Sequence, residues 1–512
     1  MAELSPLFPI PLLILIFSIL IWLKLAKRNN NLRLPPSPPK LPIIGNIHQL
    51  GKLPHRSLRD LSSKYGPLLL LRLGHNPTLL VSSADIVKEI VKNHDAVFSN
   101  RPKTTAADIL LYGCKDLGFA PYGEYWKQVK KISVLELFSH KRVQSFQFVR
   151  DEEVGVIIDK IRGACRKGES INLSEMLVFV SNNIVSRCVI GRKTEEDDGT
   201  CSKFGLLAKR LMVLLTSFCA GDMFPYLRWL DMLTGLVPNL KALSGELDAY
   251  LDQIIEEHEA SKSNNGGAAA ANKKDFVSII FQLQKDGMLD MDLTQDNIKA
   301  ILLDMFLAGT DTTASTAEWL MAELLKHPEA MKKLQQEVRD VVGKKSKVET
   351  EDIGKMNYLK CVLKETLRLH PVAPLLLPRQ TSASVELGGY DVPSNTTVLI
   401  NAWAIQRDPE WWENPEEFMP ERFENSGVDL KGEDFRFIPF GLGRRSCPGL
   451  SFGVASIEYM VANLVYCFDW KLADGGIPEN LDMSEVYGIA VNRKTPLHVL
   501  PVSQRDCVKN ES

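Results

Sequence analysis

Apolar residues that recur every three or four positions dominate this chain, and this spacing is typical of helices that bury one face. The pattern predicts helices over residues 84–94, 143–162, 173–190, 204–218 and 450–468, with another beginning at Tyr125. The longest helical run is 294–325, and Thr294 is a suitable residue to cap its first turn. Helices should therefore make up most of the fold.

Short runs of alternating or β-branched residues predict a few strands. They cover residues 68–73, 78–82, 385–387, 390–392, 397–401, 487–491 and 497–502. Residues 101–123 and 469–480 show no clear period, and we read them as a long loop and a turn-rich segment. The sequence thus predicts a mainly α fold with small peripheral β-sheets.

The N-terminus carries a segment suited to a membrane. Residues 7–23 are apolar apart from Ser18, and basic side chains follow at Lys24, Lys27 and Arg28. The positive-inside rule then places the N-terminus in the lumen and the rest of the chain in the cytosol. A cleaved signal peptide is the rival, but the basic start and the small-residue cleavage site that it needs are missing. We expect a single retained transmembrane helix.

Composition divides the rest of the chain. Proline is dense in residues 34–42, which predicts an extended hinge between an anchor at 1–33 and one large domain at 43–512. Residues 261–274 are of low complexity and read as a linker.

The net charge of -2 gives no basic field for nucleic acid. The nine cysteines include no C-x-x-C pair, which argues against a zinc site or a disulfide framework.

One cysteine stands in an unusual setting. Residues 440–449 read F-G-L-G-R-R-S-C-P-G, and an apolar helical pattern follows from Leu450. Glycines allow tight turns and close approach, and a helix N-terminus favours the thiolate form of Cys447, which is a strong metal ligand. A cysteine taken at random is more often an inert buried residue. The fixed spacing of its neighbours favours a ligand here.

A second unusual segment lies inside the longest predicted helix. Residues 308–313 read A-G-T-D-T-T, where glycine and consecutive threonines should weaken or interrupt the helix. Such a break can make room for a water molecule or a diatomic ligand. Taken alone, the segment is better explained as a slightly poor helix.

These motifs together resemble those of the cytochrome P-450 family. The spacing Phe440-x-x-Gly443-x-Arg445-x-Cys447-x-Gly449 is similar to the family's haem-ligand loop. P-P-S-P-P-K-L-P-I-I-G-N near the N-terminus and A-G-T-D-T-T point to the plant A-type microsomal branch. The resemblance covers essentially the whole chain and implies the cytochrome P-450 fold, with residues 43–512 as the haem-binding catalytic domain.

The resemblance also implies roles for particular residues. Cys447 would be the axial ligand of the iron of haem b, Phe440 would shield its sulfur, and the backbone near Gly449 would bond to it. Thr312 would hydrogen-bond the bound oxygen, and Asp311 would help to deliver protons. The haem propionates would contact Trp126, Lys130, Arg379 and Arg445, although the family usually has arginine where this chain has Lys130. A buried charge network would join Glu365, Arg368 and Arg422.

The implied function is a membrane-anchored monooxygenase that acts on terpenoid, alkaloid, phenylpropanoid or coumarin compounds. Its electrons would come from NADPH through NADPH-cytochrome P-450 reductase at the endoplasmic reticulum, with cytochrome b5 as a further candidate partner. A basic docking face would comprise Lys127, Lys130, Lys131, Lys141 and Arg142. The implied substrate contacts at 110–119, 212–218, 301–308, 372–377 and 486–489 are mostly apolar, which favours a lipophilic molecule. The alternatives are a haem-thiolate isomerase or dehydratase that uses no O2, and a non-catalytic haem-binding membrane protein.

Overall fold

The computed structural model describes residues 16–18, 32–193, 203–264, 275–289, 291–488 and 490–503. Most of the predicted membrane segment at 7–23 therefore lies outside the described residues, as do residues 265–274 of the predicted linker.

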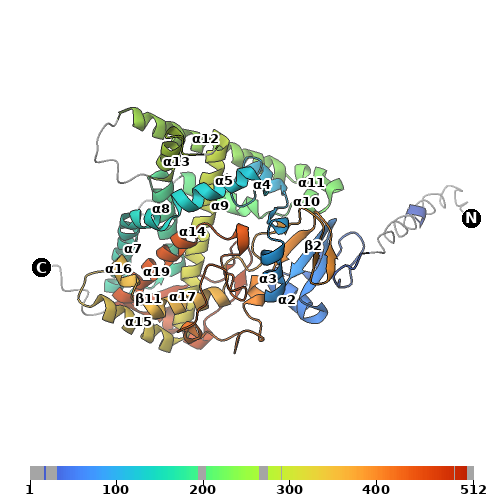
Figure 1. Ribbon diagram of the computed structural model, residues 1–512. Helices are drawn as coiled ribbons and strands as arrows, with labels where there is room; N and C mark the ends of the chain where they lie inside the picture. Colours follow the sequence, from blue (N-terminus) through green and yellow to red (C-terminus); the bar gives the residue numbers. More distant parts are fainter. Residues whose placement is uncertain are drawn as a thin grey trace, which may run out of the picture.

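The described chain is mainly helical, as predicted (Figure 1). Its helices are α2 (Pro54–Tyr65), α3 (Ala84–Asn93), α4 (Thr105–Leu110), α5 (Glu124–Ile132), α6 (His140–Ser145), α7 (Gln147–Lys167), α8 (Leu173–Ile190), α9 (Lys203–Leu215), α10 (Ala220–Met223), α11 (Arg228–Leu233), α12 (Leu236–Asn264), α13 (Phe276–Lys285), α14 (Gln295–Lys326), α15 (Pro328–Val342), α16 (Thr350–Ile353), α17 (Asn357–Leu369), α18 (Ala402–Ile405) and α19 (Leu450–Cys467).

The strands are short and lie at the margins of the helical body. They are β1 (Leu68–Leu73), β2 (Asn76–Val81), β3 (Ile171–Asn172), β4 (Arg379–Gln380), β5 (Val385–Leu387), β6 (Tyr390–Val392), β7 (Thr397–Ile400), β8 (Phe468–Leu472), β9 (Glu485–Val486), β10 (Asn492–Arg493) and β11 (His498–Ser503). This arrangement confirms the predicted class of fold.

Helix α14 is the centre of the helical body, and it begins where the sequence predicts. The hydroxyl of Thr294 accepts a hydrogen bond from the backbone N–H of Asn297, and the side chain of Asn297 accepts one from the N–H of Thr294. This capping box satisfies two N–H groups that the first turn would otherwise leave free. Helix α14 then runs without a break to Lys326, so the predicted interruption at 308–313 is wrong.

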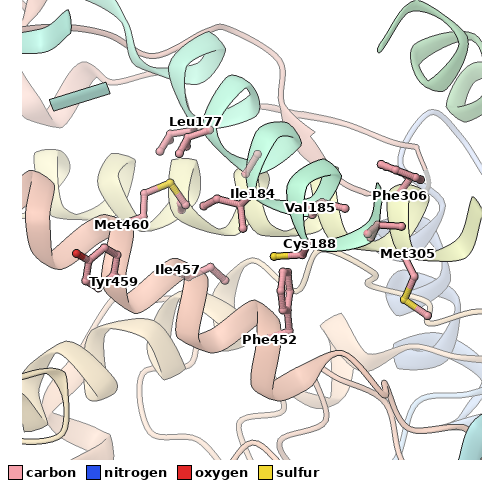
Figure 2. Close-up of a cluster of buried hydrophobic side chains, with 14 of the residues drawn as sticks. Leu177, Ile184, Val185, Cys188, Met305, Phe306, Phe452, Ile457, Tyr459 and Met460 are labelled. Carbon is pink, nitrogen blue, oxygen red and sulfur yellow. The ribbon is translucent and has the colours of Figure 1, made fainter. Parts of the chain in front are cut away.

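The glycine in that segment has a packing role. A Cβ atom at Gly309 would lie 2.9 Å from Cγ2 of Val185 on α8, closer than two carbon atoms can approach. Gly309 therefore lets α8 and α14 cross in close contact. Figure 2 shows side chains of α8, α14 and α19 filling one cluster, with Val185 and Cys188 near Phe452 of α19. This packing places the helix that follows the cysteine loop against the middle of α14.

The larger sheet brings distant parts of the chain together. Its strand order is β1-β2-β7-β4, in which β1 and β2, the strands predicted at 68–73 and 78–82, pair antiparallel and β2 is parallel to β7. Strand β4 pairs Arg379 with Val398 of β7. An isolated bridge between Asn100 and Gln380 then holds Arg101 close to Arg379.

Several local expectations need correction. Helix α4 lies within residues 101–123, which we expected to be a loop, because the side chain of Thr104 caps it by accepting a hydrogen bond from the N–H of Ala107. Strand β8 occupies part of the segment read as turn-rich, where it pairs with β11. Helix α12 extends to Asn264, so the first residues of the predicted linker are helical.

Residues 34–42 are extended but not free. The carbonyl of Pro36 accepts a hydrogen bond from the N–H of Leu70 on β1, and the side chain of Asn46 donates to the carbonyls of Pro38 and Pro39. The proline-rich segment is thus attached to the edge of the large sheet.

Two helices of the described chain, α8 and α19, are long and apolar enough to cross a membrane. About two thirds of each, 67%, is buried in the protein, where both pack against α14. Their apolar composition is explained by this core packing.

Candidate active site

The cysteine loop turns back on itself before α19 begins. The backbone N–H of Cys447 donates to the carbonyl of Phe440 at 2.8 Å, and both Gly441 and Gly443 adopt positive φ angles, of 73° and 60°. A Cβ atom at Gly443 would also lie 2.5 Å from Oδ1 of Asp95. Glycine is therefore required at 443 by both the backbone angle and the space. The turn leaves Cys447 two residues before the helix cap at Gly449.

The thiol of Cys447 is accessible to water, yet the protein surrounds it closely enough for desolvation to raise its pKa. Such a group faces an interior surface rather than bulk solvent. Hydrogen bonds from the backbone N–H groups of Gly449 and Leu450, together with the charge of Lys130, lower the pKa and favour the thiolate. The loop therefore presents a potential metal ligand that is partly stabilised as an anion.

Helix α14 carries an accessible strip in its otherwise buried middle. From Asn297 to Leu325, the residues that are not buried are Asp304, Ala308, Gly309, Asp311 and Thr312. The hydroxyl of Thr312 donates to the carbonyl of Ala308, one turn earlier. Burial raises the pKa of Asp311, and the charge of Lys209 opposes this. Both residues of the expected oxygen-binding segment thus lie on an interior surface.

Three arginines form a buried cluster near the cysteine loop: Arg101, Arg379 and Arg445. Their like charges act on one another, and burial is the main reason why the pKa of each is lowered, to about 10 for Arg379 and Arg445. Most of their hydrogen bonds go to backbone carbonyls, such as that from Arg379 Nη2 to Leu442 at 2.7 Å. The cluster is therefore strongly cationic.

Neutralising carboxylates are scarce around these arginines. The single acidic contact of Arg379 is with Asp95, at 3.9 Å between Nη1 and Oδ1, and Nη1 has no hydrogen-bond partner in the described structure. A buried cation without a close counter-charge is costly. The cluster therefore suits a ligand that brings two carboxylates, as iron protoporphyrin does with its propionates.

Trp126 belongs to the same region. Its indole N–H donates to the carbonyl of Leu117 at 3.0 Å, and its ring lies 4.2 Å from the guanidinium of Arg445. Arg445 also donates to the carbonyls of Ser99, Leu117 and Ala120. Trp126 and Arg445 therefore brace each other and the loop at 117–120.

Lys130 points towards the cysteine loop. Its amine donates to the carbonyl of Ser446, next to Cys447, and burial lowers its pKa to about 8 although the charge of Cys447 opposes this. The structure thus places Lys130 beside the sulfur, while Lys127, Lys131 and Lys141 are exposed. Lys130 is consequently turned away from the basic face to which we assigned it.

The residues Glu365, Arg368 and Arg422 come together as an ion-pair network. Nε of Arg368 lies 2.7 Å from Oε2 of Glu365, and Nε of Arg422 lies 3.0 Å from Oε1. The side chains of Glu365 and Arg368 are fully buried. Further N–H groups of Arg368 donate to the carbonyls of Gln406, Pro415 and Glu417, so the whole guanidinium is satisfied within the protein.

Sequence reasoning missed three residues of this region. Arg101 donates to the carbonyls of Leu377 and Pro378, far away in the chain, so no local pattern could reveal it. Buried Asp116 and half-buried Asp304 form an acidic pair between the loop at 116–120 and α14. The one local signal was a carboxylate at Asp304 within an apolar helical run.

The geometry defines a class of protein. A thiol at a helix N-terminus, an accessible strip on an interior helix and a buried arginine cluster with few carboxylates around it together fit a haem-thiolate protein. The family model for cytochrome P-450 matches residues 35–500, and on that evidence the chain belongs to the cytochrome P-450 family.

Individual relatives agree with this assignment. The chain is 52% identical over 480 residues to a phenylacetaldehyde oxime monooxygenase from Prunus mume, covering 93% of this chain and 90% of the relative. It is 47% identical over 492 residues to desmethylyatein synthase from Sinopodophyllum hexandrum, covering 96% and 98%. A zebra fish cytochrome P-450 solved with progesterone superposes with a TM-score of 0.74 at 27% identity, covering 88% of this chain and 99% of that one. The protein is therefore a haem-dependent cytochrome P-450 monooxygenase.

Proposed function

We propose that this protein inserts one oxygen atom from O2 into a lipophilic small molecule of plant specialised metabolism. The observation that carries the proposal is the accessible strip on α14, which combines apolar Ala308 with the polar side chains of Asp311 and Thr312. The relatives reported above are plant proteins, and one is named as an oxime monooxygenase. Terpenoids, alkaloids, phenylpropanoids and coumarins remain the candidate substrate classes.

In this proposal Cys447 ligates the haem iron, and Arg101, Arg379 and Arg445 hold the propionates. The unpaired Nη1 of Arg379 supports this assignment, because a propionate would give it the partner that it lacks. Phe440 is half-buried beside the ligand loop, and Gly443 and Gly449 shape the backbone around the sulfur. When bound, the haem supplies the activation of O2, and thiolate ligation favours cleavage of the O–O bond.

Asp311 and Thr312 would handle the protons that this reaction consumes. The raised pKa of Asp311 lets its carboxyl hold a proton closer to neutral pH than an ordinary aspartate does. Thr312 Oγ donates to the carbonyl of Ala308, and its lone pairs can accept a hydrogen bond from a proton donor at the site. Thr312→Ala should leave haem binding intact but uncouple NADPH consumption from product formation. In Thr312→Ser, NADPH consumption and product formation should remain coupled. Tight coupling in Thr312→Ala would refute the role.

Electrons would come from NADPH through NADPH-cytochrome P-450 reductase, with cytochrome b5 as a second candidate donor. The exposed side chains of Lys127, Lys131 and Lys141 support a basic docking face for an acidic partner. Charge reversal at Lys127 and Lys131 should slow reductase-dependent turnover and weaken its salt dependence. The same reversal at exposed Lys332 on α15 is the matched control. If the two variants behave alike, the docking face is elsewhere.

Residues 1–33 would anchor the protein in the endoplasmic reticulum membrane by a single span, with 34–42 as the hinge and 43–512 as the cytosolic catalytic domain. The hydrogen bonds of Pro36 and Pro38 support a hinge that is fixed to the body at its C-terminal end.

The experiment that tests the function is reconstitution of the full chain with reductase in lipid. Candidate substrates from each class are supplied with NADPH and 18O2, and products are read by mass spectrometry. The proposal expects one atom of 18O in a product of one class. Haem reduction without any oxygenated product across the library would overturn it.

A further inference from the structure

The loop from Asp116 to Ala120 lies between the arginine cluster and α14. The arginines bind one side of the loop backbone, and α14 binds the other side. Its carbonyls face the cluster. Those of Leu117 and Ala120 accept from Arg445, and that of Gly118 accepts from Arg101 at 2.9 Å.

The N–H groups of the same loop face carboxylates. Oδ2 of Asp304 on α14 accepts from Leu117 at 2.5 Å and from Gly118 at 3.1 Å, while Oδ2 of Asp116 accepts from Phe119 at 2.7 Å. Three successive N–H groups are thus satisfied by two acidic side chains. Among the described residues, the two bonds to Asp304 tie the loop backbone to α14, and the bond to Asp116 holds the turn of the loop itself.

The two carboxyl groups meet beside Gly118. A Cβ atom there would lie 3.2 Å from Oδ2 of Asp116 and 3.6 Å from Oδ1 of Asp304, so both carboxyl groups lie against the same point of the loop. Two ionised carboxylates in this arrangement repel each other and offer acceptors only, so their juxtaposition favours a proton on one of them. Oδ1 of Asp116 is buried and has no donor among the described residues unless Asp304 carries that proton.

We propose that Asp116 and Asp304 hold one proton between them, and that this acid pair positions the 116–120 loop between α14 and the arginine cluster. The inference rests on the proposed function only in assigning the cluster to the haem propionates. Asp116 and Asp304 are positioning residues, since they act through the loop backbone rather than on haem or substrate.

Electrostatics agree with this geometry and assign the proton to Asp304. Burial and then the charge of Asp116 raise the pKa of Asp304 well above its usual range. Burial raises the pKa of Asp116 to about 6, and the Phe119 N–H, the bond from Asp304 and the charge of Arg101 act against it. The other titratable groups whose charges couple to the pair are Cys114, Tyr125 and Arg445.

The consequence concerns what the loop carries. Phe119 and Leu117 belong to one of the expected substrate-contact regions, and Arg101 and Arg445 take their orientation partly from the same carbonyls. A displaced loop would therefore change both the shape of the substrate site and the grip on the propionates. The acid pair thus influences the substrate site and the propionate contacts through the loop, without contacting substrate or haem.

The test uses the haem-loaded full chain and measures amide hydrogen exchange at Leu117, Gly118 and Phe119. In Asp304→Asn the side-chain oxygen still accepts from the loop and the amide still donates to Asp116, so exchange should stay within about threefold of the native rate. In Asp304→Leu both acceptor bonds are lost, and exchange should rise by roughly tenfold or more, because the N–H groups of Leu117 and Gly118 lose the acceptor that protects them. Equal acceleration in Asn and Leu variants would overturn the proposal.

A second measurement reads the proton itself. The native protein at neutral pH should show the infrared carbonyl band of a buried protonated carboxyl group. Asp304→Asn should lose the part of this band that belongs to Asp304, and Asp116→Asn should shift that part, because the neighbour of the protonated carboxyl group changes. Asp116→Asn should also retain exchange protection, so the proposal can be judged even if Asp304→Leu does not fold. Exposed Asp159→Asn on α7 is the control that should keep the band. A native protein without the band would refute the shared proton. Neither readout depends on turnover, so both remain valid if the proposed function fails.

Discussion

Buried arginines in this protein occur in two different settings. Arg368 is fully buried with both oxygens of Glu365 against it, and its remaining N–H groups donate to backbone carbonyls. Arg379 is also buried, but within the described part of the chain its nearest carboxylate is 3.9 Å away and Nη1 has no hydrogen-bond partner. Protein groups accept hydrogen bonds from every nitrogen atom of the Arg368 guanidinium, whereas Nη1 of Arg379 is available to a ligand. A buried arginine therefore indicates a structural site when protein groups bind all of its N–H groups, and a binding site when one of its nitrogen atoms lacks a protein partner.

The largest expected effect is in the satisfied network. Arg368→Met leaves the Glu365 carboxylate buried with only Arg422 to pair it, which should lower the free energy of unfolding by about 3–5 kcal/mol. Because protein groups alone satisfy the Arg368 guanidinium, the loss should be the same with and without haem. Chemical denaturation monitored by circular dichroism measures it. Arg162→Met, which removes an exposed pair with Asp159, is the control and should cost less than about 1 kcal/mol.

The next largest effect is expected at the arginine cluster, where a substitution should change haem retention rather than the stability of the haem-free protein. Arg379→Met removes a buried cation that the protein does not neutralise, so the haem-free protein should be as stable as the native one or more so. Haem should dissociate at least tenfold faster, as measured by transfer to apomyoglobin. Equal destabilisation of the haem-free protein by Arg379→Met and Arg368→Met would abolish the contrast between the two sites.

A smaller effect follows from pH. The pKa of Arg379 and of Arg445 is lowered to about 10 in the fold, below the ordinary value, so the unfolded chain binds more protons between about pH 10 and 12.5. These groups alone therefore make the haem-free fold more stable as pH rises through 10. Haem propionates need the charged form, so haem affinity should fall over the same range. The fall should be weaker in Arg379→Met, as haem release against pH would show.

The smallest expected effect is at Lys130. Lys130→Arg restores the residue usual in the family, and both cations can reach the Ser446 carbonyl, so stability should change by less than about 1 kcal/mol. Arginine offers a bidentate fork, so haem retention should improve slightly. A strong loss of haem in this variant would mean that the compact amine beside Cys447 has a role that arginine cannot fill.

The sequence predicted the parts of the molecule that depend on local pattern. Periodicity located α8, α14 and α19, because each buries a face whose spacing is visible along the chain. Strands β1 and β2 were located as two short apolar runs on either side of a turn that contains Gly74 and Pro77. Helix α4 was missed because six residues are too few to show a period. Strand β8 was missed because its pairing with β11 is not a local property.

The candidate site divides in the same way. Residues within motifs, such as Cys447 and Thr312, could be found from spacing. Arg101 and the Asp116–Asp304 pair could not, because their partners lie up to 277 positions away. The role given to Gly309 also changed, since only the crossing of α8 reveals why a side chain is excluded there.

The central claim is that Cys447 is the haem ligand of this protein. The direct measurement is the carbon monoxide difference spectrum of the reduced protein, recorded for the native chain and for Cys447→Ala at equal haem content. We predict a thiolate-type band in the native protein and none in Cys447→Ala. A thiolate-type band that persists in Cys447→Ala would contradict the account, because another cysteine would then hold the iron.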